Sequence, residues 1–133
     1  MRQGKPFPIT DQKMSRFLLT LGQAVQLVFT ATKDDEGGKI FVPKIPAANI
    51  MTLARAMGGG EYPISVTGIR PGEKIAEVLV SEEEMLRTED TGDCYIVHPH
   101  GWSGQGLNAE FMSETARHLS VEETRRLLED AEE

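Results

Sequence analysis

The sequence predicts a mixed α/β domain of α+β character, built from short strands and several helices. Short β-branched runs alternate along the chain with segments whose apolar residues recur at helical spacing. The chain has 133 residues, of which 39% are hydrophobic and 26% charged, as in ordinary globular proteins. Its length fits one domain, so residues 1–133 are expected to form a single unit.

The first quarter of the chain is expected to be extended and then helical. Two prolines make KPFPIT extended, because each fixes its own φ and restricts the residue before it. A second extended stretch over 16–19 leads into a helix over 21–33. Thr20 with Gln23 forms the capping-box pattern that opens this helix, and the DDEGG turn closes it.

The middle of the chain alternates between strand and helix patterns. KIFVPK reads as a short strand, AANIMTLARAMGGG as a helix ended by its glycines, and YPISVTGI as a strand. A turn at Pro71-Gly72 follows, and Lys74–Leu79 is expected to begin a further short helix. Ser81 with Glu84 repeats the capping-box pattern before another turn of helix.

The last third begins with a strand, CYIVHP, and ends with a helix. Between them, HGWSGQGLNAEFMSETARH is rich in glycine and polar residues and is expected to be mostly loop. Ser120 with Glu123 caps a final helix from Val121 to about Ala131, with Leu127 and Leu128 facing inward. Residues from about 94 to 133 are expected to be a C-terminal extension of the domain.

Charge and composition exclude several functions. The net charge of −7 leaves no basic face for nucleic acid. The apolar runs are too short to span a membrane, and the N-terminus has no hydrophobic signal-peptide segment. Cys94 is the single cysteine and cannot form an internal disulfide, which fits a reducing compartment, so a cytoplasmic location is expected.

Arg70 is the first candidate for binding chemistry. It stands where a strand runs into Pro71-Gly72, and a guanidinium offers five donors that match two phosphate oxygens at once. Glycine beside it allows a ligand to approach the backbone closely. The alternative is a surface arginine paired with Glu73 or Glu77. Arg16 is an isolated cation before an apolar run. The same alternatives apply to it: binding of an anionic ligand, or a surface arginine with a structural role.

Other candidate motifs are weaker. Cys94, His98 and His100 do not have a standard zinc spacing and lack a fourth ligand, so strand packing is the preferred role for the cysteine. The glycines of GGGE at 58–61 follow a helix instead of opening one, which is not a dinucleotide fingerprint. The chain also contains no Tyr-x-x-x-Lys pair.

Five segments, in this order, resemble one family: MSRFLLTLGQAV, GGKIFVPKIPAANIMTLA, GIRPGEKIAEVLVSEEE, DCYIVHP and ETARHLSVEETRRLL. They are similar to the C-terminal portion of bacterial UDP-N-acetylglucosamine 4,6-dehydratases of polysaccharide biosynthesis, which are extended short-chain dehydrogenase/reductases. The resemblance runs from Gly4 to about Leu128. The chain departs from the family pattern at Leu18, Gly22 and Ala76.

The resemblance implies a small substrate domain without its Rossmann half. Arg16 and Arg70 would grip the diphosphate of a UDP-sugar, and Pro71, Gly72 and Glu73 would line the nucleotide or ribose end. The NADP-binding turn and the catalytic residues of the full-length family would lie in the other half, so no cofactor is expected in this chain and it would not be a complete dehydratase.

Two further readings stay open. The same domain could belong to a related sugar-nucleotide epimerase or reductase, or it could serve as an oligomerising or partner-binding module. Without a Rossmann half, apolar residues would be exposed unless the chain self-associates or meets a separately encoded half. The residues expected to contribute to that surface are Phe17, Leu18, Phe41, Ile45 and Ile50.

Overall fold

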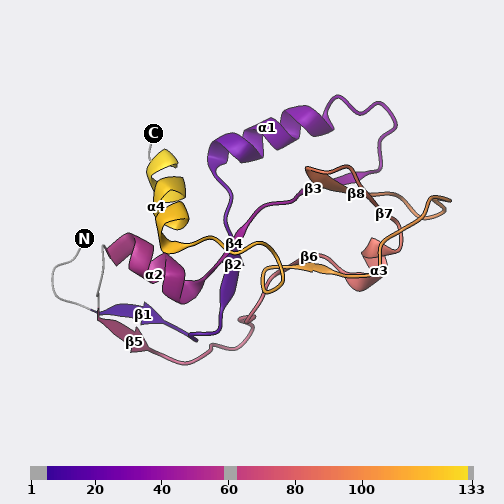
Figure 1. Ribbon diagram of the computed structural model, residues 1–133. Coiled ribbons are helices and arrows are strands. Elements are labelled where there is room, and N and C mark those ends of the chain that lie inside the picture. Colours follow the sequence, from indigo (N-terminus) through magenta and orange to yellow (C-terminus); the bar gives the residue numbers. More distant parts are fainter. Residues whose placement is uncertain (1–5, 59–62, 132–133) are drawn as a thin grey trace.

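The computed structural model describes residues 6–58 and 63–131, and the described part is a mixed α/β fold of short elements (Figure 1). This architecture confirms the fold class that the sequence predicts. The strands are β1 (Phe7–Ile9), β2 (Ser15–Phe17), β3 (Ile40–Pro43), β4 (Ala47–Asn49), β5 (Ile64–Val66), β6 (Val78–Val80), β7 (Thr88–Asp90), β8 (Cys94–Val97) and β9 (Phe111–Met112). The helices are α1 (Leu21–Ala31), α2 (Ile50–Gly58), α3 (Glu82–Met85) and α4 (Val121–Asp130).

The strands form four small sheets in place of one large one. β1 pairs with β5 in parallel, whereas β2–β4, β6–β9 and the three-stranded β3–β8–β7 sheet are antiparallel. In Figure 1 the β2–β4 pair lies at the centre, with α2, α4 and β1–β5 on one side and the three-stranded sheet with α3 on the other. Segments far apart in the sequence therefore meet around β2.

Two groups of buried residues hold these parts together. One lies between the three-stranded sheet, β6 and α3, and comprises Val42, Val80, Met85 and Val97, with Tyr95, Leu107 and Phe111 packed against it. The other is the set of buried apolar residues on or next to β2, β4, α2 and α4, namely Met14, Ala47, Ala48, Ala54, Ala56 and Leu119. Small residues predominate in the second group, so α2 and α4 can pack closely beside each other.

Local sequence signals correctly predict where α1, α3 and α4 begin. Thr20, Ser81 and Ser120 each accept a hydrogen bond from the backbone of the residue three positions on, and that residue's side chain accepts one in return. All three capping boxes are confirmed. The last helix has Leu127 and Leu128 half-buried, as its pattern predicts.

The predicted helix over Lys74–Leu79 is wrong. Residues 75 and 76 form a bend, and Val78–Val80 is strand β6, paired antiparallel with β9. The physical reason is tertiary pairing: the VLV run gains a partner strand from residues 111–112, and strand propensity depends on such packing. The predicted helix over AANIMTLARAMGGG is wrong in its first three residues, which form β4 by pairing with β2, so the helix begins at Ile50. Strands β7 and β9 are additions to the predicted elements. The predicted helix end over Gly58–Gly60 is observed only at Gly58, since residues 59–62 lie outside the described part.

The most exposed apolar element is α1, not the residues expected from the resemblance. Phe17, Leu18, Phe41, Ile45 and Ile50 are all half-buried. In α1 no residue is buried, and the exposed fractions are 80% for Leu21, 46% for Val25, 61% for Val28 and 59% for Phe29. These four side chains recur at helical spacing, so they share one face of the helix.

Among the described residues, no helix has the length and hydropathy needed to cross a bilayer.

A candidate anion-binding site around Arg16 and Arg70

The backbone around Arg70 forms a turn that two hydrogen bonds between Arg70 and Glu73 hold together. The Glu73 N–H donates to the Arg70 carbonyl (3.1 Å), and the Arg70 N–H donates to Glu73 Oε2 (2.9 Å). Gly72 has φ +87°, and proline followed by a glycine of positive φ is the requirement of a type II turn. The turn therefore presents the Arg70 side chain from a constrained backbone.

The Arg70 side chain is exposed, and within residues 6–58 and 63–131 its guanidinium makes no hydrogen bond or ion pair. The pairing considered as an alternative does not form: the Glu73 carboxylate accepts from the Arg70 backbone, and the Glu77 carboxylate lies beside Arg16. Space beside the turn is open, because a Cβ built on Gly72 would meet no atom within 4 Å. A ligand can approach this arginine and the turn together.

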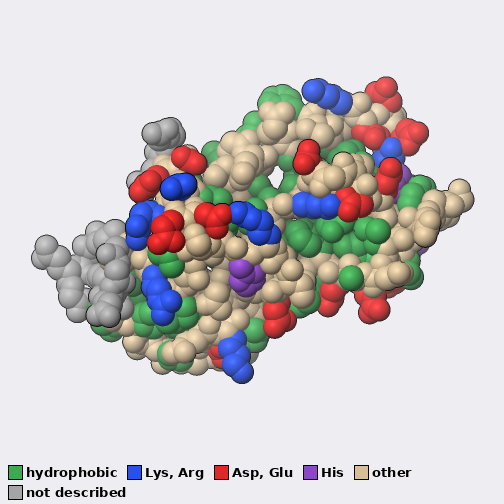
Figure 2. Space-filling view, in the orientation of Figure 1, with side chains coloured by type: hydrophobic (Ala, Val, Ile, Leu, Met, Phe, Trp, Pro, Cys, Tyr) green, Lys and Arg blue, Asp and Glu red, His purple; other side chains and the backbone are tan. Residues whose placement is uncertain are grey.

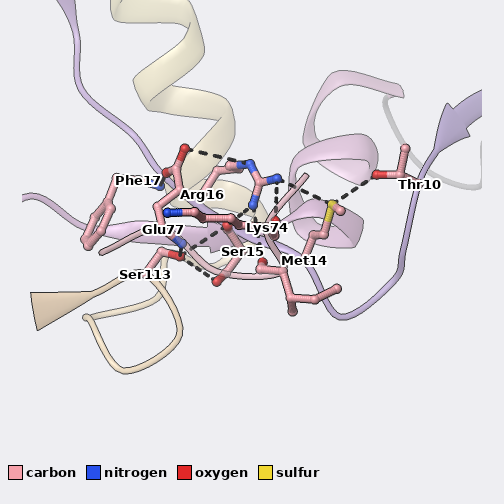
Figure 3. A network of polar contacts seen from close by, with 9 residues as sticks. Thr10, Met14, Ser15, Arg16, Phe17, Lys74, Glu77 and Ser113 are labelled. Carbon is pink, nitrogen blue, oxygen red and sulfur yellow. Dashed lines mark hydrogen bonds and ion pairs between the residues drawn. The ribbon is translucent and has the colours of Figure 1, made fainter. Parts of the chain in front are cut away.

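Arg16, on β2, is in a different situation (Figure 3). Its guanidinium donates to the carbonyls of Ser15 (2.6 Å), Lys74 (2.9 Å) and Ile75 (3.2 Å), and more weakly to the sulfur of Met14 (3.5 Å). Its Nε faces the Glu77 carboxylate at 3.8 Å. All five donor directions are thus directed at protein atoms. Arg16 braces the chain just after the Arg70 turn, and an anion would reach it by replacing one of these acceptors.

Two further residues, Glu77 and Ser113, tie this arrangement together. Glu77 Oε2 accepts the Phe17 N–H (2.9 Å), so its carboxylate bridges two neighbouring residues of β2. The Glu77 N–H in turn donates to the buried Ser113 hydroxyl (2.8 Å). That hydroxyl pairs with the Ser15 hydroxyl at 2.8 Å. Three segments distant in sequence therefore meet beside Arg16.

The segment 70–77 carries two basic residues, Arg70 and Lys74, and two acidic residues, Glu73 and Glu77. The Glu77 carboxylate is paired with Arg16 at 3.8 Å. Across the face shown in Figure 2, acidic and basic side chains are interspersed and no continuous basic strip appears. This pattern suits a small anionic ligand better than a polyanion.

The Cys94, His98 and His100 set does not assemble into a site. His98 stacks on Trp102 (4.3 Å between ring centroids, 4° between planes), and its Nε2 lies 3.1 Å from Glu89. His100 is exposed in a turn. Burial, with the nearby Asp93 charge, raises the pKa of the Cys94 thiol, which disfavours its reactive thiolate form. In the described ranges no three of His, Cys, Asp or Glu gather as metal ligands.

Sequence reasoning names Arg16, Arg70, Pro71, Gly72 and Glu73 as site residues but does not single out Ser15 or Ser113. It considers Glu77 only as an alternative partner of Arg70, whereas the Glu77 carboxylate faces Arg16. A lone serine in a polar loop carries no distinguishing signal. The role of Ser113 becomes visible only in the structure, where the pairing of β6 with β9 places the 111–113 segment beside residue 77.

The fold and the site define a small α/β domain with an exposed arginine on a rigid turn, suited to binding an anionic small molecule. Residues 1–99 match the family model described as polysaccharide biosynthesis protein, and the chain belongs to this family.

Individual relatives agree with this family. UDP-glucose 4-epimerase of Rickettsia canadensis is 36% identical over 96% of this chain, and the uncharacterised membrane protein MJ1061 of Methanocaldococcus jannaschii is 33% identical over 98%. The solved structure of Pen from Bacillus thuringiensis has a TM-score of 0.83 and 27% identity over 98% of this chain. In each case the match covers 42% of the other protein, so the chain spans less than half the length of these relatives.

Proposed function

We propose that the chain is the nucleotide-sugar-binding domain of a polysaccharide-biosynthesis 4,6-dehydratase, with a UDP-N-acetylglucosamine-like ligand, and is not catalytically complete alone. The single observation that carries the proposal is the exposed Arg70 guanidinium, which extends from a hydrogen-bonded turn. The segment directly after this turn is held by Arg16. The similarity to UDP-glucose 4-epimerases supports a nucleotide sugar equally well for an epimerase. In this proposal residues 1–133 act as one domain, and NADP belongs to the part of the relatives that this chain does not span.

The proposed roles follow from the geometry. Arg70 contacts the diphosphate directly, since its donors are available. Arg16 approaches the diphosphate by exchanging its weakest acceptor, the Met14 sulfur, for a phosphate oxygen, which is a stronger acceptor of a charge-assisted bond. Pro71 and Gly72 form the open surface of the turn, and Glu73 fixes its shape while lining the nucleotide end.

The test is a calorimetric titration of UDP into the chain and into Arg70→Ala. A charge-assisted hydrogen bond contributes about 1.5–3 kcal/mol, so the variant should bind UDP roughly 10- to 150-fold more weakly. Arg126→Ala, which removes an exposed arginine of α4, is the matched control and should bind UDP as the unchanged chain does.

Two further ligands sharpen the result. With UMP, which lacks the second phosphate, the difference between the unchanged chain and Arg70→Ala should shrink. Comparing UDP-N-acetylglucosamine with UDP-glucose reports which sugar the domain prefers. Absence of UDP binding, or equal binding by Arg70→Ala, would contradict the proposal.

A second candidate, an assembly module, is favoured by one observation. The exposed face of α1 belongs to a helix without a single charged residue, in a chain that is 26% charged. Such uncharged apolar faces are typical of contact surfaces. We therefore keep self-association, or contact with a separately encoded half, as the alternative function.

A further inference from the structure

We propose that Ser113 is a positioning residue for the arginine site: its buried hydroxyl holds Glu77 and Ser15 in place and thereby sets the Arg16 guanidinium on the Lys74 and Ile75 carbonyls, which follow the Arg70 turn. The inference rests on the proposed function. It also assigns a role to a segment beyond residues 1–99, the part of the chain that the family model matches.

The Ser113 hydroxyl has three hydrogen-bond partners. Ser113 is fully buried, and its Oγ accepts the Glu77 N–H (2.8 Å). The same oxygen lies 2.8 Å from the Ser15 hydroxyl, where either hydroxyl can donate, and 3.2 Å from the Ser15 carbonyl, to which it can donate its proton. A hydroxyl has one proton to donate and two lone pairs to accept with, so these partners match what a buried serine can bond.

The backbone of Ser113 is fixed on both sides. Its N–H donates to the Glu77 carbonyl (2.8 Å), so residues 77 and 113 are joined by both backbone and side chain. Its carbonyl accepts from His118 Nε2 (2.8 Å), and residues 117–119 are in turn bonded to Ala47 of β4. The serine is therefore anchored to the central strand pair and does not move with a free loop.

From Ser113 the contacts lead to Arg16 and to the segment that follows the Arg70 turn. Glu77, held by the serine, places its carboxylate against Arg16 Nε and the Phe17 N–H. Arg16 then bonds the carbonyls of Lys74 and Ile75, immediately after the Arg70–Glu73 turn. Figure 3 shows the Glu77 carboxylate and the Met14 sulfur meeting the Arg16 guanidinium, with Ser113 beside Ser15 and Glu77. Removing the hydroxyl would free Glu77 and Ser15 to shift, and the arginine with them.

The test compares Ser113→Ala with a matched loss of a buried hydroxyl elsewhere. Thr88 is also fully buried, its hydroxyl donates to the Glu84 carbonyl (2.7 Å), and it lies in the three-stranded sheet away from β2 (Figure 1). Both Ser113→Ala and Thr88→Val should lower thermal stability. Only Ser113→Ala should weaken UDP binding, by about 3- to 10-fold, which is the effect of one hydrogen bond.

A double variant separates positioning from general destabilisation. If the serine acts through Arg16, Ser113→Ala should have almost no further effect on UDP affinity in an Arg16→Ala background, because coupled residues are not additive. Full additivity would overturn the proposal. Amide hydrogen exchange at Phe17 and Glu77 measures the stability of these contacts in the absence of ligand. Exchange at both amides should be faster in Ser113→Ala but not in Thr88→Val.

Should Ser113→Ala fail to fold, Ser15→Ala removes the hydroxyl pair from the β2 side and should weaken UDP binding by a smaller factor. Unchanged UDP affinity in the folded serine variants, with binding still dependent on Arg70, would overturn this inference alone. Failure of the unchanged chain to bind UDP would overturn the proposed function together with it.

Discussion

At the scale of single residues, the two arginines differ in their surroundings. The Arg70 guanidinium is available to a ligand, and the Arg16 guanidinium is engaged by the protein. Arg70 has its backbone fixed and its guanidinium available, whereas every donor of Arg16 is directed at a protein acceptor. A cation that binds a small anionic ligand benefits from such preorganisation, because less ordering is required on binding. The braced arginine therefore supports the available one.

Gly72 allows a residue-scale test of the turn. Gly72→Ala should lower the free energy of unfolding by about 1–2 kcal/mol, because φ +87° is costly for a residue with a Cβ although the site has room for one. Gly22→Ala, in α1 and also without a neighbour within 4 Å, is the matched control and should instead stabilise, by up to about 1 kcal/mol. Chemical denaturation measures both. Equal effects of the two changes would show that the turn does not require positive φ.

At the scale of elements, the capping boxes are the clearest link from sequence to structure. In α3 the Glu84 carboxylate accepts from the Ser81 N–H (3.0 Å) and from its hydroxyl (2.9 Å). These bonds lower the pKa of Glu84, the backbone bond contributing most. A carboxyl group with a lowered folded-state pKa stabilises the fold above its unfolded-state pKa, and this contribution is lost as the pH falls through the folded value.

Glu84→Gln should therefore make the free energy of unfolding depend less steeply on pH at acidic pH. Glutamine keeps the acceptor of the capping box but cannot titrate. From about pH 6 down to pH 3, across the ordinary carboxyl range near pH 4.3, the variant should lose less unfolding free energy than the unchanged chain. Glu83→Gln, at an exposed neighbouring position, is the control and should retain the original slope. The prediction would be contradicted if the free energy of unfolding of Glu84→Gln fell with decreasing pH as steeply as that of the unchanged chain.

The capping boxes and the Arg70 turn are predictable because each depends on residues within a few positions of one another. The strand pairings and the Arg16 brace are not. Arg16 bonds main-chain carbonyls 58 and 59 positions away, and a carbonyl carries no side-chain signature. The misassigned helix over 74–79 has the same origin, since only the partner strand β9 makes Val78–Val80 a strand. Ser113 has no signature in the sequence, because its contacts arise from that pairing.

At the scale of the whole molecule, two observations concern what covers the exposed apolar face of α1. The chain spans 42% of the length of the relatives it matches, and α1 presents an exposed apolar face. In Figure 1 this helix lies apart from the central strand pair, above the three-stranded sheet. Its face continues into a groove between the start of α1 and the end of α4, lined by Leu21, Val25 and Ala131.

We expect this face to mediate weak self-association. Because α1 has no charged residue, the same face on a second copy can pack against it without charge repulsion. The chain should therefore sediment as a concentration-dependent mixture of the 14.7 kDa monomer and a larger species. Val28→Glu, which places a charge in the centre of the face, should shift the mixture toward monomer and leave the fold intact, since Val28 is 61% exposed.

Leu86→Glu provides the matched control for this experiment, because Leu86 is 64% exposed but lies at the end of α3. It should leave the sedimentation profile unchanged. A standard interface buries about 800 Å² per partner, and one helix face supplies less than that, so association confined to high concentration is the expected strength. A monomer at all concentrations would show that this face does not bind its own copy, and an equal effect of both variants would place the contact elsewhere.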